Sequence, residues 1–510
     1  MDKGGFSLAK PLPIFYSALL LTFVNLLLRA AGTSFQVYLS ATIGAAGIGL
    51  LQLTMSVGSL AMVAGMGGVR TATMYLTADE LGRGKQQNVT WVLSGCCLYS
   101  IAFSGTVGLL LYCNAPRIAE GWIGDSRTVD SLRLFAGFLP TTCLCGVMTG
   151  YFTAANRIGT LAAIEVAEQL ASMSITLGLL RFWSGSDAGR ACLCVILGSA
   201  LGGCFTLICL IFLRLRERTP AGPRIPVAGR LLRAGLPLAV ADDMKSGINT
   251  LENLMVPKRL ALHSLTGEPL AAFGLVSGMV FPVLMFPACI LFALAELLIP
   301  ELARCSAADS RERISYLVRR SLKVASLYGF LFSGLMFLVG QPLCLALYGN
   351  AEAGKHLKLY ALLIPMLYCD AITDAMTKGL GQQAVCVRYN ILTSAMDVAL
   401  LYCFLPVYGM MGYYLSFLVT HLINFGLSLR RLLKITGLRI SVKTPVLATL
   451  ATAFAVLLIS RVPGVSGRIV LYPIVLFCLL TLLGIVDRED LIWILRLPVK
   501  AQSSKKRRSA

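Results

Sequence analysis

The sequence predicts an all-α protein that crosses a membrane many times. Hydrophobic residues make up 56% of the chain and charged residues only 14%, and the mean hydropathy is +0.76, which is far from soluble norms. Apolar runs of about twenty residues, enough to cross the roughly 30 Å of bilayer hydrocarbon, recur along the whole chain. These runs are too long and continuous for the strands of an outer-membrane barrel.

The apolar runs define about fourteen transmembrane spans, numbered here in chain order. An even number returns both ends of the chain to one side of the membrane. Spans 1, 7 and 10 are the least hydrophobic, so their assignment depends partly on that even number. The expected spans are 12–37, 47–69, 91–112, 131–153, 161–182, 191–213, 235–260, 273–299, 322–340, 358–379, 389–405, 412–429, 445–460 and 468–486.

Positive charge orients these spans. The chain has 45 Lys and Arg against 25 Asp and Glu, a net charge of +20, and membrane proteins collect Lys and Arg on cytoplasmic loops. About 32 of the 45 lie in the segments predicted to be cytoplasmic. We therefore expect both termini in the cytoplasm, and the charge needs no nucleic-acid partner. The cytoplasmic segments are the N-terminus, 70–90, 154–160, 214–233, 301–323, 378–390, 430–443 and 487–510.

Signatures of enzymes and metal centres are missing from the sequence. It contains no Walker loop, no G-x-S-x-G, no H-E-x-x-H and no soluble insertion large enough for a catalytic domain. There are only three histidines, and many of the 16 cysteines lie in apolar runs without CxxC spacing, as small hydrophobic residues do. We expect a protein that is not an enzyme, with no catalytic residue, metal or cofactor.

An internal repeat divides the chain. Aligning Gly49 with Gly274 also places Gly150 near Gly379, and Glu168 near Asp397, at nearly the same offset. Two six-span halves related by an axis along the membrane normal are a common plan of transporters. The predicted parts are an N-terminal lobe (1–213), a basic cytoplasmic linker (214–233), a C-terminal lobe (234–430), and spans 13 and 14 with a basic tail (431–510).

Span 1 carries polar groups on one helical face. Asn25, Arg29 and Gln36 are spaced by four and seven residues. Charged groups inside spans are costly and usually face a cavity or a partner. They predict a cationic wall for an anionic substrate, and the alternative is that Arg29 pairs with a carboxylate. Arg70, at the cytoplasmic end of span 2, is either a second substrate-binding cation or an orienting charge.

Span 7 is too polar to lie against lipid. Its polar residues follow helical spacing on one face, and Pro237 and Pro257 mark bends or ends. Because spans 1 and 7 open the two halves, we expect both to flank a central cavity. Lys245 and Asn249 are candidates for substrate binding, and the acidic residues are candidates for charge balance or coupling. The polar residues of span 7 are Asp242, Asp243, Lys245, Asn249 and Glu252.

Carboxylates in other spans could balance charge or bind a coupling cation or proton, and structural pairing explains them equally well. Asp374 in span 10 is one turn from Lys378, so these two could form a simple helical ion pair. The remaining candidates are Glu168, Glu296, Asp374 and Asp397.

Several segments resemble the polysaccharide-biosynthesis family of oligosaccharide flippases. They are ATIGAAGIGLLQL (41–53), TADELGRGKQQN (77–88), GYFTAANRIGTLAAIEVAEQL (150–170), AGLPLAVADDMKSGINTLENLMVPKRLA (234–261) and FPACILFALAELLIPELAR (286–304). The likeness extends over roughly 12–430 and is strongest to the sporulation members from Gram-positive bacteria. The sequence departs from the family pattern at Thr153, where Gln is usual, and at Ser172, where an Arg is common.

The resemblance implies the multidrug/oligosaccharidyl-lipid/polysaccharide exporter superfamily, with two six-helix lobes in a V. It also implies ATP-independent, alternating-access movement of an undecaprenyl-linked sugar, with Arg29 matching an arginine in span 1 of the lipid II flippases. The expected location is the bacterial cytoplasmic membrane, and the expected partners are the polyprenyl-linked substrate, membrane lipid and cell-wall synthesis proteins. Coupling by membrane potential, proton or sodium is compatible with this plan.

Three functional hypotheses follow. The first is a flippase for undecaprenyl-pyrophosphate-linked oligosaccharide or peptidoglycan precursor, serving cell-wall or spore-cortex synthesis. The second is a cation-coupled multidrug antiporter of the same fold, which the carboxylates of span 7 favour. The third is a non-transporting scaffold for envelope assembly, which charges buried in spans disfavour.

The predicted topology can be tested on the linker. Single cysteines introduced between 214 and 233 in a cysteine-free chain should react with a membrane-impermeant maleimide only after the cytoplasmic face is opened, because Arg-rich segments stay inside. Labelling in intact cells would contradict the whole arrangement of spans.

Overall fold

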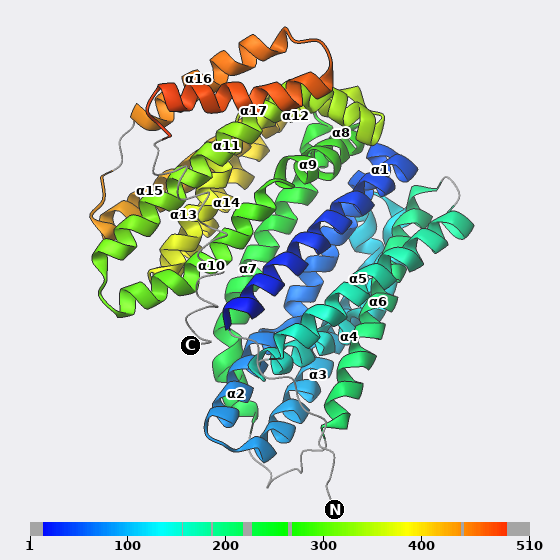
Figure 1. The fold of residues 1–510 in the computed structure, drawn as a ribbon. Coiled ribbons are helices and arrows are strands. Elements are labelled where there is room, and N and C mark those ends of the chain that lie inside the picture. The colour runs from blue at the N-terminus through cyan, green and yellow to red at the C-terminus, as the bar shows by residue number, and fades with distance from the viewer. Residues whose placement is uncertain are drawn as a thin grey trace, which may run out of the picture. The chain divides into compact units, whose positions relative to one another are not determined.

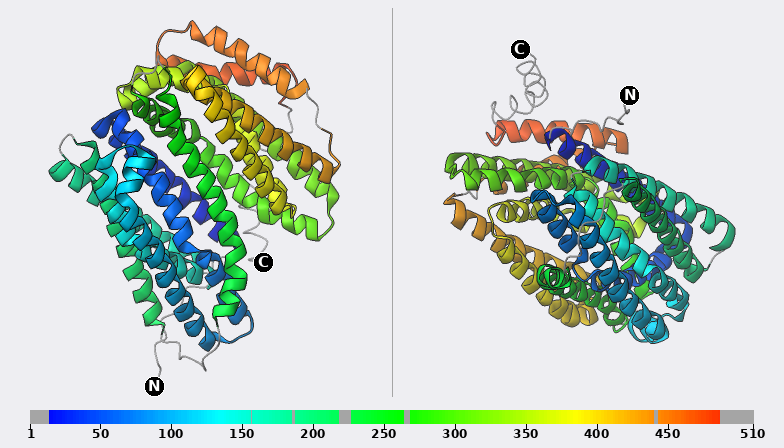
Figure 2. Two further views of the ribbon diagram at one scale, coloured as in Figure 1. Left: turned by 180° about the vertical axis from the view of Figure 1, so that it is seen from behind. Right: turned by 90° about the horizontal axis from the view of Figure 1, so that it is seen from below.

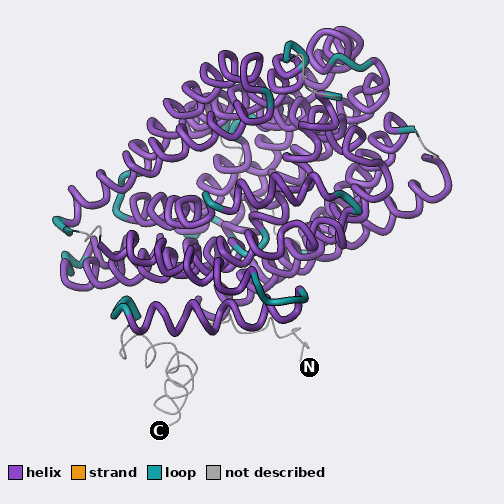
Figure 3. Tube along the Cα trace, turned by 90° about the horizontal axis from the view of Figure 1, so that it is seen from above, coloured by secondary structure: helices purple, strands orange, loops and turns teal. Residues whose placement is uncertain are grey.

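A computed structural model describes residues 14–155, 157–184, 187–217, 227–263, 268–439 and 443–486. Within these ranges every regular element is a helix and there is no strand (Figure 1, Figure 3). The predicted fold class is therefore confirmed. Residues 218–226 of the basic linker lie outside the described residues, as do the N-terminal residues before Ile14 and the tail after Val486.

Seventeen α-helices follow one another in the described ranges, some of them extended by short 3-10 or π turns. Their bounds are α1 Ile14–Met66, α2 Val69–Gly82, α3 Val89–Ile118, α4 Val129–Ala154, α5 Ile158–Leu179, α6 Ala188–Arg216, α7 Ala228–Leu260, α8 Pro269–Leu275, α9 Phe281–Met285, α10 Ala288–Ala307, α11 Arg311–Tyr348, α12 Ala351–Ala361, α13 Ile364–Gly379, α14 Gln383–Tyr408, α15 Met410–Thr436, α16 Lys443–Ser460 and α17 Val465–Leu482.

The helices agree with most of the predicted spans. By length and composition 10 helices in the described ranges could cross a membrane, or up to 12 if each of two bent pairs is one span. Two further features explain why this count falls short of the fourteen predicted spans. Helix α1 runs through spans 1 and 2 with a break at Gly44, where φ is 70°, and α7 is a continuous helix too polar to qualify.

Several predicted boundaries were wrong. Span 10 is a pair of helices, α12 and α13, bent by 59°, because Pro365 in the first turn of α13 has no N–H to continue α12. Span 8 is interrupted by a π turn and by a break at Phe286 and Pro287. Pro237 lies inside α7 and does not open it, since the helix begins at Ala228. Helix α6 reaches Arg216, which leaves a shorter connection than 214–233.

By its contacts the chain divides into two units. The first contains residues 1–282 with 390–420, and the second contains 283–389 with 421–510. The predicted lobes, 1–213 and 234–430, stay a prediction. One difference concerns α7, which was expected to lead the second half and which packs within the first unit against α1 and α2.

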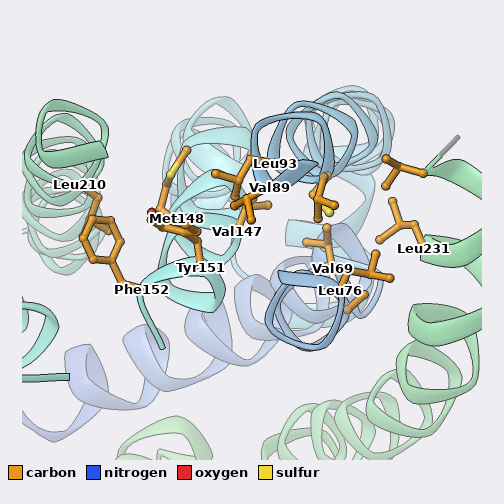
Figure 4. Close-up of a cluster of buried hydrophobic side chains, with 14 of the residues drawn as sticks. Val69, Leu76, Val89, Leu93, Val147, Met148, Tyr151, Phe152, Leu210 and Leu231 are labelled. Atoms are coloured by element: carbon orange, nitrogen blue, oxygen red, sulfur yellow. The ribbon is translucent and has the colours of Figure 1, made fainter. Parts of the chain in front are cut away.

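The first unit has a core formed by α2, α3 and α4, with side chains of α5, α6 and α7 (Figure 4). Val92 and Phe152 are fully buried there, and Leu231 of α7 joins the cluster. Arg230 ties the same end of α7 to α2, donating to Glu80 at 2.6 Å and to Asp79 at 2.8 Å. Asn88 donates to the buried Glu80 at 2.9 Å. Apolar packing and charge pairing therefore fix the beginning of α7 on the first-half helices.

Helices α1 and α8 cross at small residues. A Cβ on Gly274 would lie 2.0 Å from the carbonyl oxygen of Ala45 and 2.9 Å from the Cα of Gly49, so only glycine fits at this position. Gly274 on α8 faces Ala45 and Gly49 on α1, and a Cβ on Gly49 would in turn lie 2.3 Å from the carbonyl oxygen of Leu270, so small residues let the two backbones approach closely. Gly49 and Gly274 are the pair that the sequence repeat aligned.

The second unit is built on the long helix α11. Helices α16 and α17 lie side by side along it (Figure 2). The fully buried Tyr472 of α17 donates its hydroxyl to the carbonyl of Phe330 at 3.0 Å, and its ring fills the space that a side chain at Gly334 would need. Spans 13 and 14 thus pack along α11 as part of this unit.

The α1–α8 crossing yields a stability prediction. Gly274→Ala should destabilise the protein by about 1–3 kcal/mol, because its methyl group must push two backbones apart. Gly105→Ala on α3 is the matched control, since nothing lies within 4 Å of the position that its Cβ would take. Thermal unfolding in detergent would measure both. Equal melting temperatures for the two variants would contradict the tight crossing.

Candidate functional site

The predicted polar face of α1 is only partly available to a ligand. The side chain of Asn25 lies outside what the structure describes. Arg29 is exposed. Gln36 is half-buried and donates its amide to the carbonyl oxygen of Gly278 at 3.2 Å, inside the π turn Val276–Val280. The amide nitrogen of Gln36 thus satisfies a backbone acceptor, a structural role that sequence reasoning missed.

Helix α7 has two different polar faces. On one, Thr250 donates to the carbonyl of Ser56 and Asn253 donates to its hydroxyl, both at 3.0 Å, which joins α7 to α1. The other carries the predicted residues. Asp242, Lys245 and Asn249 are exposed. Three of the predicted site residues are therefore accessible on α7, whose other polar face is bonded to α1.

Asp243 lies beside that exposed face and is half-buried. One of its carboxylate oxygens is buried without a hydrogen-bond partner among the described residues. The nearest charged neighbour is Asp242, and the Tyr99 ring of α3 also lies close. The pair Asp242–Asp243 therefore makes a strongly acidic spot next to Lys245.

Glu252 and Asp397 meet in the interior of the first unit. Asp397 of α14 is only 6% exposed, and it accepts hydrogen bonds from Ser416 at 2.5 Å and from Thr420 at 3.1 Å, both on α15. The side chain of Glu252 on α7 lies close enough to interact with the same carboxyl group. Two ionised carboxylates at this range would repel each other, and a proton shared between them would remove that repulsion.

Glu168 occupies the corresponding position in the first half. On α5, it accepts a hydrogen bond from Thr206 of α6 at 2.6 Å. The second half repeats this arrangement, because Asp397 of span 11 accepts from Ser416 and Thr420 of span 12. The glycines Gly150 and Gly379, also paired by the repeat, likewise each face a backbone oxygen, of Arg70 and Ile299 respectively.

The other predicted residues lie apart from this pair. Arg70 is exposed and its charge acts on Glu165 of α5. In the second unit Asp374 forms an ion pair with Lys378 at 2.5 Å, which favours the structural interpretation of both residues. Glu296 is exposed on α10. Within the described ranges no three His, Cys, Asp or Glu side chains are grouped to hold a metal ion.

Comparison with solved structures defines the class of fold. The lipid II flippase MurJ in an inward closed conformation matches with a TM-score of 0.72 and 13% identity, over 93% of this chain and 100% of that one. An inward-facing multidrug resistance MATE family transporter of the MOP superfamily matches with a TM-score of 0.61 and 14% identity, over 82% of this chain and 100% of that one. The chain therefore has the fold of the MOP-superfamily transporters.

Sequence comparison points to more particular relatives. Stage V sporulation protein B of Bacillus subtilis (strain 168) is 21% identical over 410 residues, which cover 77% of this chain and 78% of that protein. Sporulation protein YkvU of the same organism is 21% identical over 231 residues, 44% of this chain and 52% of that protein. No protein-family model matches. The resemblance that the motifs indicated is confirmed.

The buried acceptor at Asp397 yields a second stability prediction. Asp397→Leu should destabilise the protein by about 1–3 kcal/mol, because the buried Ser416 hydroxyl would lose its acceptor at 2.5 Å and keep only the carbonyl oxygen of residue 397 at 3.4 Å. Asp397→Asn keeps an acceptor oxygen and should cost much less. Melting temperatures in detergent compare the two, and a Leu variant as stable as the Asn variant would contradict the network.

Proposed function

We propose that the chain is a flippase for undecaprenyl-pyrophosphate-linked sugars, including peptidoglycan precursor, at the bacterial cytoplasmic membrane. The observation that carries this proposal is the pair of exposed cations, Arg29 and Lys245, on helices α1 and α7, which pack against one another. A charge within a membrane bundle faces a water-filled cavity, a ligand or another polar group, because lipid does not solvate it, and Arg29 also interacts with another group of the protein. The MurJ-like fold and the similarity to a sporulation protein support the lipid-linked substrate.

The chemistry of the substrate fits this arrangement. A pyrophosphate presents several anionic oxygens, which guanidinium and ammonium groups bind by charge-assisted hydrogen bonds. Arg29 and Lys245 would attract the pyrophosphate, and Asn249 would bond sugar hydroxyls. Arg70 is a further candidate cation. The polyprenyl tail stays in lipid throughout, so the protein has to move only the polar head.

The Glu252–Asp397 pair supports a coupling role. Release of the shared proton would leave two carboxylates in contact, and their repulsion in a medium of low dielectric would favour a change in the position of α7 relative to α14. In this scheme proton binding and release drive alternating access, and the chain needs no ATP-binding motif. Both termini would face the cytoplasm, where cell-wall synthesis enzymes supply the substrate.

A cation-coupled drug antiporter is the second candidate. The acidic spot at Asp242 and Asp243 favours it, since such carboxylates attract cationic amphiphiles. The fold is shared with multidrug resistance transporters of the MATE family. The two candidates differ in which charges contact the substrate.

A flipping assay separates these candidates. In cells depleted of their own lipid II flippase, the chain should restore outward exposure of labelled lipid II, and Arg29→Ala with Lys245→Ala should reduce that exposure by at least tenfold, the effect of losing roughly 1.4 kcal/mol of substrate binding. Arg83→Ala is the matched control, because its exposed pair with Asp79 contributes little.

Each outcome of the flipping assay is decisive. No exposure above background together with gained drug resistance would favour the antiporter. Neither activity, with the protein correctly inserted, would favour a scaffold. Exposure that survives loss of both cations would contradict the cationic site while leaving the flippase intact.

The coupling role has its own test. Glu252→Gln keeps a hydrogen-bond donor toward Asp397 but cannot release a proton, so transport in proteoliposomes should lose its dependence on an imposed pH gradient, while binding of substrate in detergent stays within about twofold of wild type. A variant that still responds to the gradient would contradict proton coupling at this pair.

A further inference from the structure

The first three turns of α11 carry a stripe of cations on one helical face. Its residues follow the i, i+4 and i+1, i+5 spacing of a single face, and they line an open surface hollow of about 580 Å³ in the second unit. We call these residues the α11 stripe. They are Arg311, Glu312, Ser315, Tyr316, Arg319, Arg320 and Lys323.

The stripe has the chemistry of an anion site. It offers four cations against one carboxylate, and the hydroxyls of Ser315 and Tyr316 add two neutral donors. Arg320 and Lys323 also interact with other groups of the protein, and Arg311 has only a long, fully exposed pair with Asp309 at 3.6 Å. Arg311 and Arg319 are therefore the cations most accessible to a ligand, and their forked guanidinium groups match phosphate oxygens.

The depth of the stripe favours a lipid as the source of the phosphate. Helix α11 has 38 residues, so it is about 57 Å long at 1.5 Å per residue, much longer than the roughly 30 Å of hydrocarbon. Its apolar part, 324–348, is about 37 Å long and crosses the hydrocarbon by itself. The stripe ends at Lys323, directly before that apolar part, and therefore lies at the level of the lipid headgroups.

Orientation of the helix does not by itself explain this pattern. The positive-inside rule requires cations near the cytoplasmic end, but it does not require them to share one face around a hollow. Arg313, which lies off the stripe, is instead paired with Glu301 of α10 at 2.5 Å. The cations of the α11 stripe thus lie together on one face, whereas the charge of Arg313 is neutralised by Glu301.

We propose that the α11 stripe binds the headgroup of an anionic phospholipid, a glycerol phosphodiester, at the cytoplasmic face. Arg311 and Arg319 hold the phosphate, and Tyr316 and Ser315 donate to the glycerol oxygens. The bound lipid anchors α11, on which the second unit is built, at a fixed depth. This site is distinct from the residues proposed to bind the transported substrate.

Native mass spectrometry of the full chain in uncharged detergent tests the proposal. Phosphatidylglycerol should bind on the order of tenfold more tightly than phosphatidylcholine, and Arg311→Gln with Arg319→Gln should remove most of that preference. The matched control is Arg304→Gln with Arg388→Gln, which removes the same charge from exposed sites off the stripe. Unchanged melting temperatures without lipid would show that both double variants are folded.

Four results would overturn the proposal. Equal binding of the two lipids by the wild type would show that there is no such site. An equal loss of the preference for phosphatidylglycerol in the control variant would indicate unspecific attraction. Displacement of phosphatidylglycerol by inorganic phosphate indicates a site for free anions. If only the full-length variant Asp487→Asn, Glu489→Gln, Asp490→Asn binds phosphatidylglycerol, the occupant of the stripe is the chain's own C-terminal segment.

Discussion

The constraint on which this structure depends is that hydrocarbon offers no partner to a polar group. Every backbone amide must be paired within a helix, and every buried side-chain donor or acceptor needs a partner in the protein. The described chain accordingly contains only helices, and several of its interior polar groups come in bonded sets. Gln36 serves a backbone carbonyl in a π turn, and Ser416 and Thr420 serve Asp397. Polar residues that stay exposed on α7 are the exception, and a function is the natural reason to keep them.

The two halves meet this constraint with the same devices. In each, a carboxylate on the fifth span accepts from a hydroxyl on the sixth, as Glu168 does from Thr206 and Asp397 does from Ser416. In each, a glycine at the end of the fourth or tenth span lies against the backbone of the second or eighth, as Gly150 does against Arg70 and Gly379 does against Ile299. A repeat with few identical letters therefore preserves the positions where two helices must touch or a charge must be paired. This explains why an internal repeat with few identities still paired residues that have the same structural role in both halves.

Composition and periodicity were enough to predict the class of fold, most spans and the unusual polarity of span 7, because hydrocarbon imposes strong one-dimensional rules on a helix. The candidate site was predicted only as separate residues. That Glu252 contacts Asp397 depends on how α7 packs beside α14, and no spacing in the sequence encodes that distance. The hydrogen bond from Gln36 depends on a π turn at Gly278, which composition does not reveal. The break between α12 and α13 was missed as well, although Pro365 was a signal that could have been read.

The one clear asymmetry between the halves bears on mechanism. Glu168 is bonded to a hydroxyl, and such a pair is satisfied with the carboxylate ionised. Asp397 has two hydroxyl donors and in addition the carboxyl of Glu252, brought by the helix that otherwise packs on the first-half helices α1 and α2. Only the second of these arrangements brings two carboxyl groups together, where a shared proton would remove their repulsion, and it does so between α7 and α14. In the proposed coupling, loss of a proton shared between α7 and α14 would act on both helices, which a coupled transporter needs and a static scaffold does not.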